Sequence, residues 1–449
     1  MKNPLNNRFF RELREDFGKY FVIFLLLVTT VGFVSGFLVA DGSMIIAYRE
    51  GFEKYNIEDG YFELNRKANR LQKDEIEEMG IDLYENFYAE EALTNGSTLR
   101  IFQNREEVNL VCLMEGEFPD AADEIAIDRM YADNNGLQPG DVISGKTRSW
   151  EVTGLVALSD YSCLFSSNQD SMFDAIKFGV AVVAPETFED FTKEELHFRY
   201  SWKYEQAPLN EKEEQEWAEE LMKNLVSVVT LEEFVPLYQN QAIQFTGDDM
   251  GSDRAMMIAL LYIVIVIMAF VFGVIISNTI AKEANVIGTL RASGYTRGEL
   301  IRHYMVMPML VTAVGAVLGN ILGYSIFKDI CAGMYYGSYS LPTYRTVWNG
   351  EAFVLTTVIP VLMMLAINFL FLRRKLKLSP LKFLRRDLNR RKQKRAFPLN
   401  DRIPFFERFR LRVIFQNMSN YGILLAGILF ANLLLRIGSH AKPSSHLYS

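Results

Sequence analysis

Four long apolar runs, separated by polar segments, dominate the chain. They cover residues 21–40, 255–280, 304–327 and 352–372. Each has the length of about 20 residues that a helix needs to cross a hydrocarbon core about 30 Å thick. No small-residue cleavage pattern follows the first run, so it is not a cleaved signal peptide. A soluble protein would need a very large core to cover all four. The pattern therefore predicts a membrane protein with four helical spans.

A fifth apolar run, residues 421–435, is shorter than the others. Its length of about 15 residues does not suffice for a span, and the polar tail 436–449 cannot extend it. A basic, Phe-rich stretch precedes it near Phe405, as a similar stretch near Phe9 precedes the first run. Both stretches are typical of helices that lie in a membrane interface. We expect a second copy of the unit to begin here and to be truncated in its fifth span.

The region between the first two runs, residues 41–254, has a mixed pattern. Short apolar or alternating segments at 124–127, 150–156 and 178–185 predict strands. The acidic segment 210–225 predicts a solvated helix with Asn210 as its N-cap. We therefore expect an α+β domain between the first and second spans.

The distribution of charge predicts the orientation of the spans in the membrane. Residues 41–254 contain 45 acidic and 18 basic residues, whereas the rest of the chain has a net charge of +19. Basic residues gather in 1–20, 281–303 and 373–420, and the positive-inside rule makes these three segments cytoplasmic. The α+β domain and the short loop 328–351 are then extracytoplasmic.

Signals for chemistry are weak along the whole sequence. The sequence has neither a G-x-x-x-x-G-K-[ST] phosphate loop nor a G-x-S-x-G nucleophile elbow, and its four histidines are scattered. We expect no enzymatic activity, no metal site and no cofactor bound by this chain. Cys112 and Cys163 could pair or remain free, and Cys331 lies near the outer end of the third run. The basic linker fits anionic membrane lipid better than nucleic acid.

Small residues mark contact faces on two of the predicted spans. The glycines concerned are Gly32 and Gly36 in the first run and Gly315, Gly319 and Gly323 in the third. This spacing lets helix backbones approach closely, within this chain or against a second one. The polar residues inside the runs include three asparagines, Asn278, Asn320 and Asn368. We interpret them as interhelical hydrogen-bonding groups.

The segment between the second and third runs predicts a short amphipathic helix. Val286, Ile287 and Leu290 are spaced for one helical face, and Arg291 suits the negative end of the helix dipole. Gly294 is placed to stop this helix in a left-handed conformation.

A second helix should begin directly afterwards. Thr296 and Glu299 form a T-x-x-E capping box, the usual start signal of a helix. Paired stop and start signals favour a docking element over a plain connector.

The sequence around this segment, "AKEANVIGTLRASGYTRGELIRHYMVMPMLVTAVGAVLGNILG", resembles the signature of FtsX-like ABC-transporter permeases. The matching residues are Glu283, Ile287, Gly288, Leu290, Arg291, Ala292, Gly294, Thr296 and Arg297. The chain departs from the signature at Ala284 and Asn285, where the family has a further basic residue. The outer stretch "LMEGEFPDAADEIAIDRMYADNNGLQPGDVISG" is similar to the outer domain of MacB-type permeases.

The resemblance implies a multi-pass subunit in a bacterial cytoplasmic membrane, the N-terminal half of a duplicated permease. It would pair with a separate cytoplasmic ATPase, which uses the ATP, and with a second permease unit. The implied ATPase-coupling residues are Glu283, Ile287, Leu290, Arg291, Gly294, Thr296, Arg297 and Glu299.

We consider three alternative functions for this sequence. The chain could export a peptide, lipoprotein or lipid-like substrate, or it could move no substrate and regulate a cell-wall hydrolase or sensor through its outer domain. A simple receptor is the third, and it has no need of a capped coupling helix. Nothing in the sequence identifies a substrate.

Overall fold

The structure is a computed structural model that describes residues 14, 17–146, 148–192, 194–386, 404, 406–407 and 410–411. It divides into two compact units. The first comprises residues 1–279 and 296–377, and the second comprises 280–295 and 378–449. The predicted N-terminal interfacial helix, most of the basic linker, the fifth apolar run and the polar tail lie outside the described residues.

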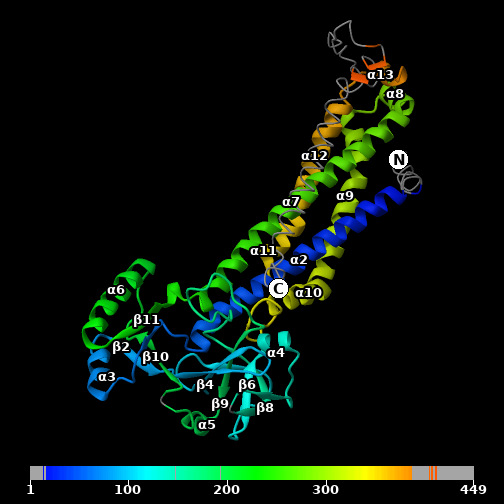
Figure 1. Ribbon diagram of the computed structural model, residues 1–449. Coiled ribbons are helices and arrows are strands. Elements are labelled where there is room, and N and C mark those ends of the chain that lie inside the picture. The colour runs from blue at the N-terminus through cyan, green and yellow to red at the C-terminus, as the bar shows by residue number, and fades with distance from the viewer. Residues whose placement is uncertain are drawn as a thin grey trace. The chain divides into compact units, whose positions relative to one another are not determined.

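The described residues contain four helices that are long and apolar enough to cross a membrane, as the pattern predicts (Figure 1). The first two are α2 (Phe17–Lys54) and α7 (Gln241–Lys282). The third consists of α9 (Arg297–Leu322), the π-helical turn η2 (Gly323–Phe327) and α10 (Lys328–Tyr336). The fourth consists of α11 (Gly350–Phe353), the π-helical turn η3 (Val354–Val358) and α12 (Ile359–Lys375).

One predicted boundary differs in the structure. The predicted outer loop 328–351 contains helix α10, which continues the third span to Tyr336. The predicted coupling segment 281–303 contains α8 and the first residues of α9, which begins at Arg297, as the Thr296 capping box predicts.

Helices α2 and α7 are much longer than a membrane crossing requires. They contain 38 and 42 residues, which correspond to roughly 57 and 63 Å of helix. Their additional turns lie in the region assigned above to the α+β domain, and they pack against each other. The Tyr48 hydroxyl of α2 donates to the Ile243 carbonyl of α7 at 2.9 Å. The sheet itself therefore begins only at Gly60 and ends at Pro236.

A single mixed sheet forms the domain between α2 and α7, here called the sheet domain. Its strands are β1 (Gly60–Leu64), β2 (Ile81–Glu85), β3 (Tyr88–Ala92), β4 (Thr98–Gln103), β5 (Val111–Gly116), β6 (Glu124–Asp128), β7 (Val142–Ser144), β8 (Ser149–Leu158), β9 (Phe178–Val183), β10 (Leu196–Tyr204) and β11 (Leu231–Pro236). In the described part of the chain the order is β11-β1-β10-β3-β4-β9-β6-β8-β5, with β2 on β10 and β7 on β8. The pairs β4–β9 and β6–β8 are parallel.

Four short helices accompany the sheet. They are α3 (Arg70–Glu77), α4 (Arg129–Asn135), α5 (Pro185–Glu189) and α6 (Glu211–Val228). Helices α3 and α6 lie beside β2 and β11 (Figure 1). Together they bury Ile76 and Leu225 against Phe62 and Trp202.

The predicted elements of the sheet domain are confirmed with small shifts. Segment 124–127 is β6, and Asn210 caps α6 by accepting from the backbone N–H groups of Lys212 and Glu213. Strand β9 ends at Val183, because Pro185 opens α5 instead of only ending the strand. The thiols of Cys112, Cys163 and Cys331 are free.

Candidate functional site

Helix α8 (Ala284–Ala292) forms between the second and third spans, where the sequence predicts it. Its buried face is formed by Ala284, Ile287 and Gly288. Val286 was expected on the same face, but its side chain is 42% exposed. Because residues at i, i+3 and i+4 share a helical face, a stripe through 284, 287 and 288 places Val286 on the opposite side.

The stop of α8 at Gly294 is confirmed. Gly294 has a φ of 99°, in the left-handed region that favours glycine. The Tyr295 N–H donates to the Leu290 carbonyl at 3.0 Å, and the Gly294 N–H donates to the Arg291 carbonyl at 3.4 Å. These two bonds form a Schellman motif, which satisfies carbonyls that the helix end would otherwise leave free.

The start of α9 is also confirmed. The Glu299 N–H donates to the Thr296 hydroxyl oxygen at 3.3 Å, and the Thr296 N–H donates to the Glu299 carboxylate at 2.8 Å. This reciprocal pair is a capping box. Arg297, the first residue of the helix, has an exposed side chain. Only two residues separate Gly294 from this helix, so α8 and α9 have independent, locally encoded ends.

The buried face of α8 packs against a helix that the sequence analysis missed. Helix α13 (Pro380–Leu384) belongs to the basic linker, and it lies beside α8 (Figure 1). A Cβ atom at Gly288 would lie 2.8 Å from the Leu384 Cγ and 3.0 Å from the Leu384 backbone nitrogen. Ser379 followed by Pro380 is the sequence signal that could have revealed this helix, since proline is favoured in the first turn.

The glycine ladder is a contact between two helices of this chain. Helices α2 and α9 pack closely where these glycines lie. A Cβ atom at Gly319 would lie 2.9 Å from the Val31 Cβ, and one at Gly32 would lie 3.1 Å from the Gly319 carbonyl oxygen. A Cβ at Gly36 would lie 2.6 Å from the Phe327 Cβ. Gly315 and Gly323 face α2 in the same way, so of the two alternatives the structure shows the contact within one chain.

Asn320 links three of the spans. Its amide oxygen accepts from Ser35 of α2 at 2.8 Å and from Thr356 of η3 at 3.0 Å. Its amide nitrogen donates to the Thr357 hydroxyl at 2.8 Å. The interhelical role expected for Asn320 is thus confirmed. Such bonds help to hold helices together where lipid tails offer no alternative partner.

The other two asparagines do not behave as expected. The Asn368 amide donates to the Met364 carbonyl of its own helix at 3.0 Å. Asn278 is exposed on α7. The sequence could not separate these cases from Asn320, because the difference depends on which face each helix turns toward its neighbours.

A polar joint connects the sheet domain to the segment after α10. The Ser340 hydroxyl donates to the buried Asp128 carboxylate, and the Arg129 guanidinium donates to the carbonyls of Tyr336 and Tyr339, both at 2.8 Å. The Ser340 N–H also donates to the Ser162 carbonyl at 2.9 Å. Asp128 additionally caps α4. Sequence reasoning missed this joint, because its partners are about 200 residues apart.

The stability of this joint depends on pH, because Asp128 is buried. Burial raises the pKa of the Asp128 carboxyl to about 6, despite the Ser340 hydrogen bond, which lowers the pKa. Because the folded pKa lies above the unfolded one, the stabilising contribution of the protonated Asp128 carboxyl is complete below pH 4 and is lost as pH rises through 6.

We expect Asp128→Asn to reduce this pH-dependent loss in the free energy of unfolding by about 2–3 kcal/mol. Thermal unfolding of the full chain in detergent at pH 4.5 and 7.5 measures it. Exposed Asp123 provides the matched control Asp123→Asn, and equal pH slopes in both variants would contradict the assignment.

The described residues contain no group of His, Cys, Asp and Glu side chains that could hold a metal ion.

Comparisons with known proteins agree with the sequence signature. Residues 258–380 match the family model of the FtsX-like permease C-terminal domain, and this range contains α8 and the whole of α9. No curated protein matches the chain.

Two solved structures are similar to parts of the chain. The periplasmic region of MacB from Actinobacillus actinomycetemcomitans is 11% identical over 44% of this chain and 98% of its own length, with a TM-score of 0.25. The extracellular domain of the noncanonic ABC-type transporter YknZ from Gram-positive bacteria is 12% identical over 39% of this chain and 100% of its own length, with a TM-score of 0.21.

Proposed function

We propose, from the match of residues 258–380 to the FtsX-like permeases, that this chain is the permease subunit of an ABC transporter. It would couple a separate cytoplasmic ATPase to an extracytoplasmic sheet domain and would work with a second permease unit. The substrate class would be a peptide, lipoprotein or lipid-like molecule. The observation that carries this proposal is helix α8, a short helix with its own stop signal, placed between two spans.

The two faces of α8 have different roles: one is supported by α13, and the other is available for docking a partner. Gly288 faces α13, and Ile287 is buried beside it. Asn285, Val286 and Thr289 are exposed and therefore available to a partner. This division refines the expected coupling set, in which Ile287 becomes a supporting residue and Val286 a contact residue.

The docking face can be tested by adding a charge to it. Val286→Asp should weaken binding of the ATPase by about tenfold or more, because it buries an unpaired carboxylate in the interface. The tagged full chain would be purified from its native host in mild detergent, and the copurifying ATPase and its ATP hydrolysis would be quantified. Leu71 is 79% exposed on α3, so Leu71→Asp is the matched control. A variant Val286→Asp that retained all of its ATPase would refute this docking face.

A regulator that moves no substrate is the second candidate. The joint of Asp128 and Arg129 with residues 336–340 favours it, since this joint ties the sheet domain to the end of α10. Movement of the third span could then reach the sheet domain without a passage for substrate. Transport assays with reconstituted vesicles separate the two candidates.

The orientation of the chain is tested by labelling. Single cysteines at Lys146 and Arg297, both exposed, would be introduced after replacing the three native cysteines by serine. An impermeant thiol reagent outside intact cells should modify the cysteine at 146 and not the one at 297. The reverse pattern would overturn the proposed orientation.

A further inference from the structure

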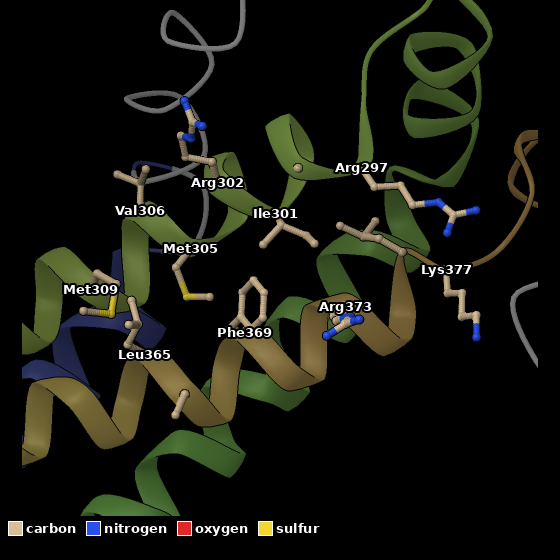
Figure 2. Close-up of a pocket in the computed structure, with 13 residues that line it drawn as sticks. Arg297, Ile301, Arg302, Met305, Val306, Met309, Leu365, Phe369, Arg373 and Lys377 are labelled. Atoms are coloured by element: carbon tan, nitrogen blue, oxygen red, sulfur yellow. The ribbon is translucent and has the colours of Figure 1, made fainter.

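A groove of about 930 Å³ lies between α9 and α12, inside the first unit (Figure 2). Its lining residues from α9 recur at four-residue spacing, as Arg297, Ile301 and Met305 do. Those of α12 do the same, as Leu365, Phe369 and Arg373 do. The two helices therefore each turn one continuous stripe toward the groove.

The groove changes from basic to apolar along its length. Figure 2 shows Arg297, Arg373 and Lys377 toward one end, where α9 begins and α12 ends. Met309 and Leu365 line the other end. Ile301 and Met305 point toward the ring of Phe369 between them. Helix α9 rises about 18 Å between Arg297 and Met309, and helix α12 rises about 15 Å between Leu365 and its end at Lys375, since each residue of a helix rises about 1.5 Å.

Three cations of this groove, Arg297, Arg373 and Lys377, form no ion pair in the part of the chain that the structure describes. The fourth, Arg302, interacts electrostatically with Glu299, one helical turn before it. No acidic residue lines the groove. The apolar wall is open as well, with Leu365 and Phe369 each 43% exposed. A ligand that fits must therefore have an anionic head and an apolar body.

We infer that this groove binds one anionic phospholipid, with its phosphate held by Arg297, Arg373 and Lys377 and an acyl chain lying along Met305 and Phe369. The length agrees, because half of a hydrocarbon core about 30 Å thick is about 15 Å. Basic pockets between helices at the cytoplasmic side commonly bind anionic headgroups. The inference takes the cytoplasmic location of the basic end from the proposed function, but it requires neither an ATPase nor transport.

The test is lipid binding by the full chain in detergent, measured by native mass spectrometry with phosphatidylglycerol and phosphatidylcholine as probes. Wild type should retain one phosphatidylglycerol in preference to phosphatidylcholine. Arg373→Gln with Lys377→Gln should weaken phosphatidylglycerol binding about 30-fold, since each cation contributes about fivefold. Arg374→Gln with Lys375→Gln removes the same charge from residues outside the groove and should change binding less than threefold.

A second pair of variants tests the apolar part. Ala366→Trp should fill the groove and displace the lipid while every cation remains. Leu370→Trp adds the same side chain at a position that is 58% exposed and outside the groove, and it should bind like wild type. Circular dichroism of all variants tests whether each is folded. If a charge variant does not fold, the two Trp variants decide whether the groove binds lipid.

Three results would overturn the inference. Equal losses in the two charge pairs would show nonspecific attraction to the basic segment. Competition by glycerol phosphate as strong as that by phosphatidylglycerol would show that only a phosphate binds. A second protein chain crosslinked to a photoreactive residue at Phe369 would show that the groove is a protein interface. A missing ATPase in the copurification would refute the proposed function and leave these measurements unaffected.

Discussion

Replacing Gly288 by leucine should abolish ATP-driven activity of the complex while leaving membrane insertion intact. The Cβ atom alone would lie 2.8 Å from the Leu384 Cγ, and the contact to the Leu384 backbone nitrogen leaves little room for adjustment. Helix α8 would therefore separate from α13 and lose the support of its buried face. We expect the ATP hydrolysis that depends on this chain to fall to the level of the ATPase alone.

Two comparisons make this prediction specific to the helix pair. A Cβ atom at Gly251 of α7 would meet nothing within 4 Å, so Gly251→Leu should retain activity. Gly288→Ala should be impaired, and adding Leu384→Ala should restore much of the activity because it removes the side-chain part of the clash. Full activity of Gly288→Leu would mean that α8 works without α13.

Replacing Gly319 by valine should destabilise the helical part of the protein by about 3 kcal/mol. The new side chain would collide with the Val31 Cβ at 2.9 Å and the Val28 carbonyl oxygen at 3.0 Å. Helices α2 and α9 would have to move apart next to Asn320, and its bond to Ser35 would lengthen or break. Unfolding of the full chain in mixed micelles by a titration with sodium dodecyl sulfate measures the loss.

The matched control is Gly333→Val in α10. A Cβ atom there would meet nothing within 4 Å, so only the small difference in helix propensity remains, and it favours valine over glycine. Its effect should stay below about 1 kcal/mol. Equal destabilisation by both substitutions would show that the α2–α9 contact tolerates a side chain and that the glycine ladder is not a packing device.

Local signals were sufficient where the structure depends on local chemistry. Gly294 stops α8 and Thr296 starts α9, because both roles are decided by backbone geometry and hydrogen bonds within a few residues. The spans were predictable for a similar reason, since apolar length alone sets the ability to cross a bilayer. The role of Asn210 as a helix cap was predictable because it also depends on hydrogen bonds within a few residues.

Features that join distant residues were missed. The support of α8 by α13 depends on the basic linker returning to Gly288, and the Asp128–Ser340 contact crosses 212 positions of sequence. No periodicity within one segment encodes such pairings. The face of α8 was misassigned at Val286 for the same reason, because the stripe that is buried depends on where α13 lies.

The hydrogen bonds of Asn320 have a mechanical consequence. They make α2, α9 and η3 a block whose internal displacement would break polar bonds in a medium that offers no replacement. Along its apolar part, helix α7 meets α2 through Tyr20, whose ring stacks on Phe272 at 6.3 Å, and meets α12 through Phe371, whose ring lies next to Gly273. Displacing the apolar part of α7 therefore disturbs mainly dispersion contacts, which are individually small and re-form at a new position. Displacing its N-terminal part would break the Tyr48–Ile243 hydrogen bond and the Arg254–Glu351 ion pair. Contacts that re-form easily thus line the apolar part of helix α7, which runs without interruption from Gln241, after the last strand of the sheet domain, to Lys282, just before α8.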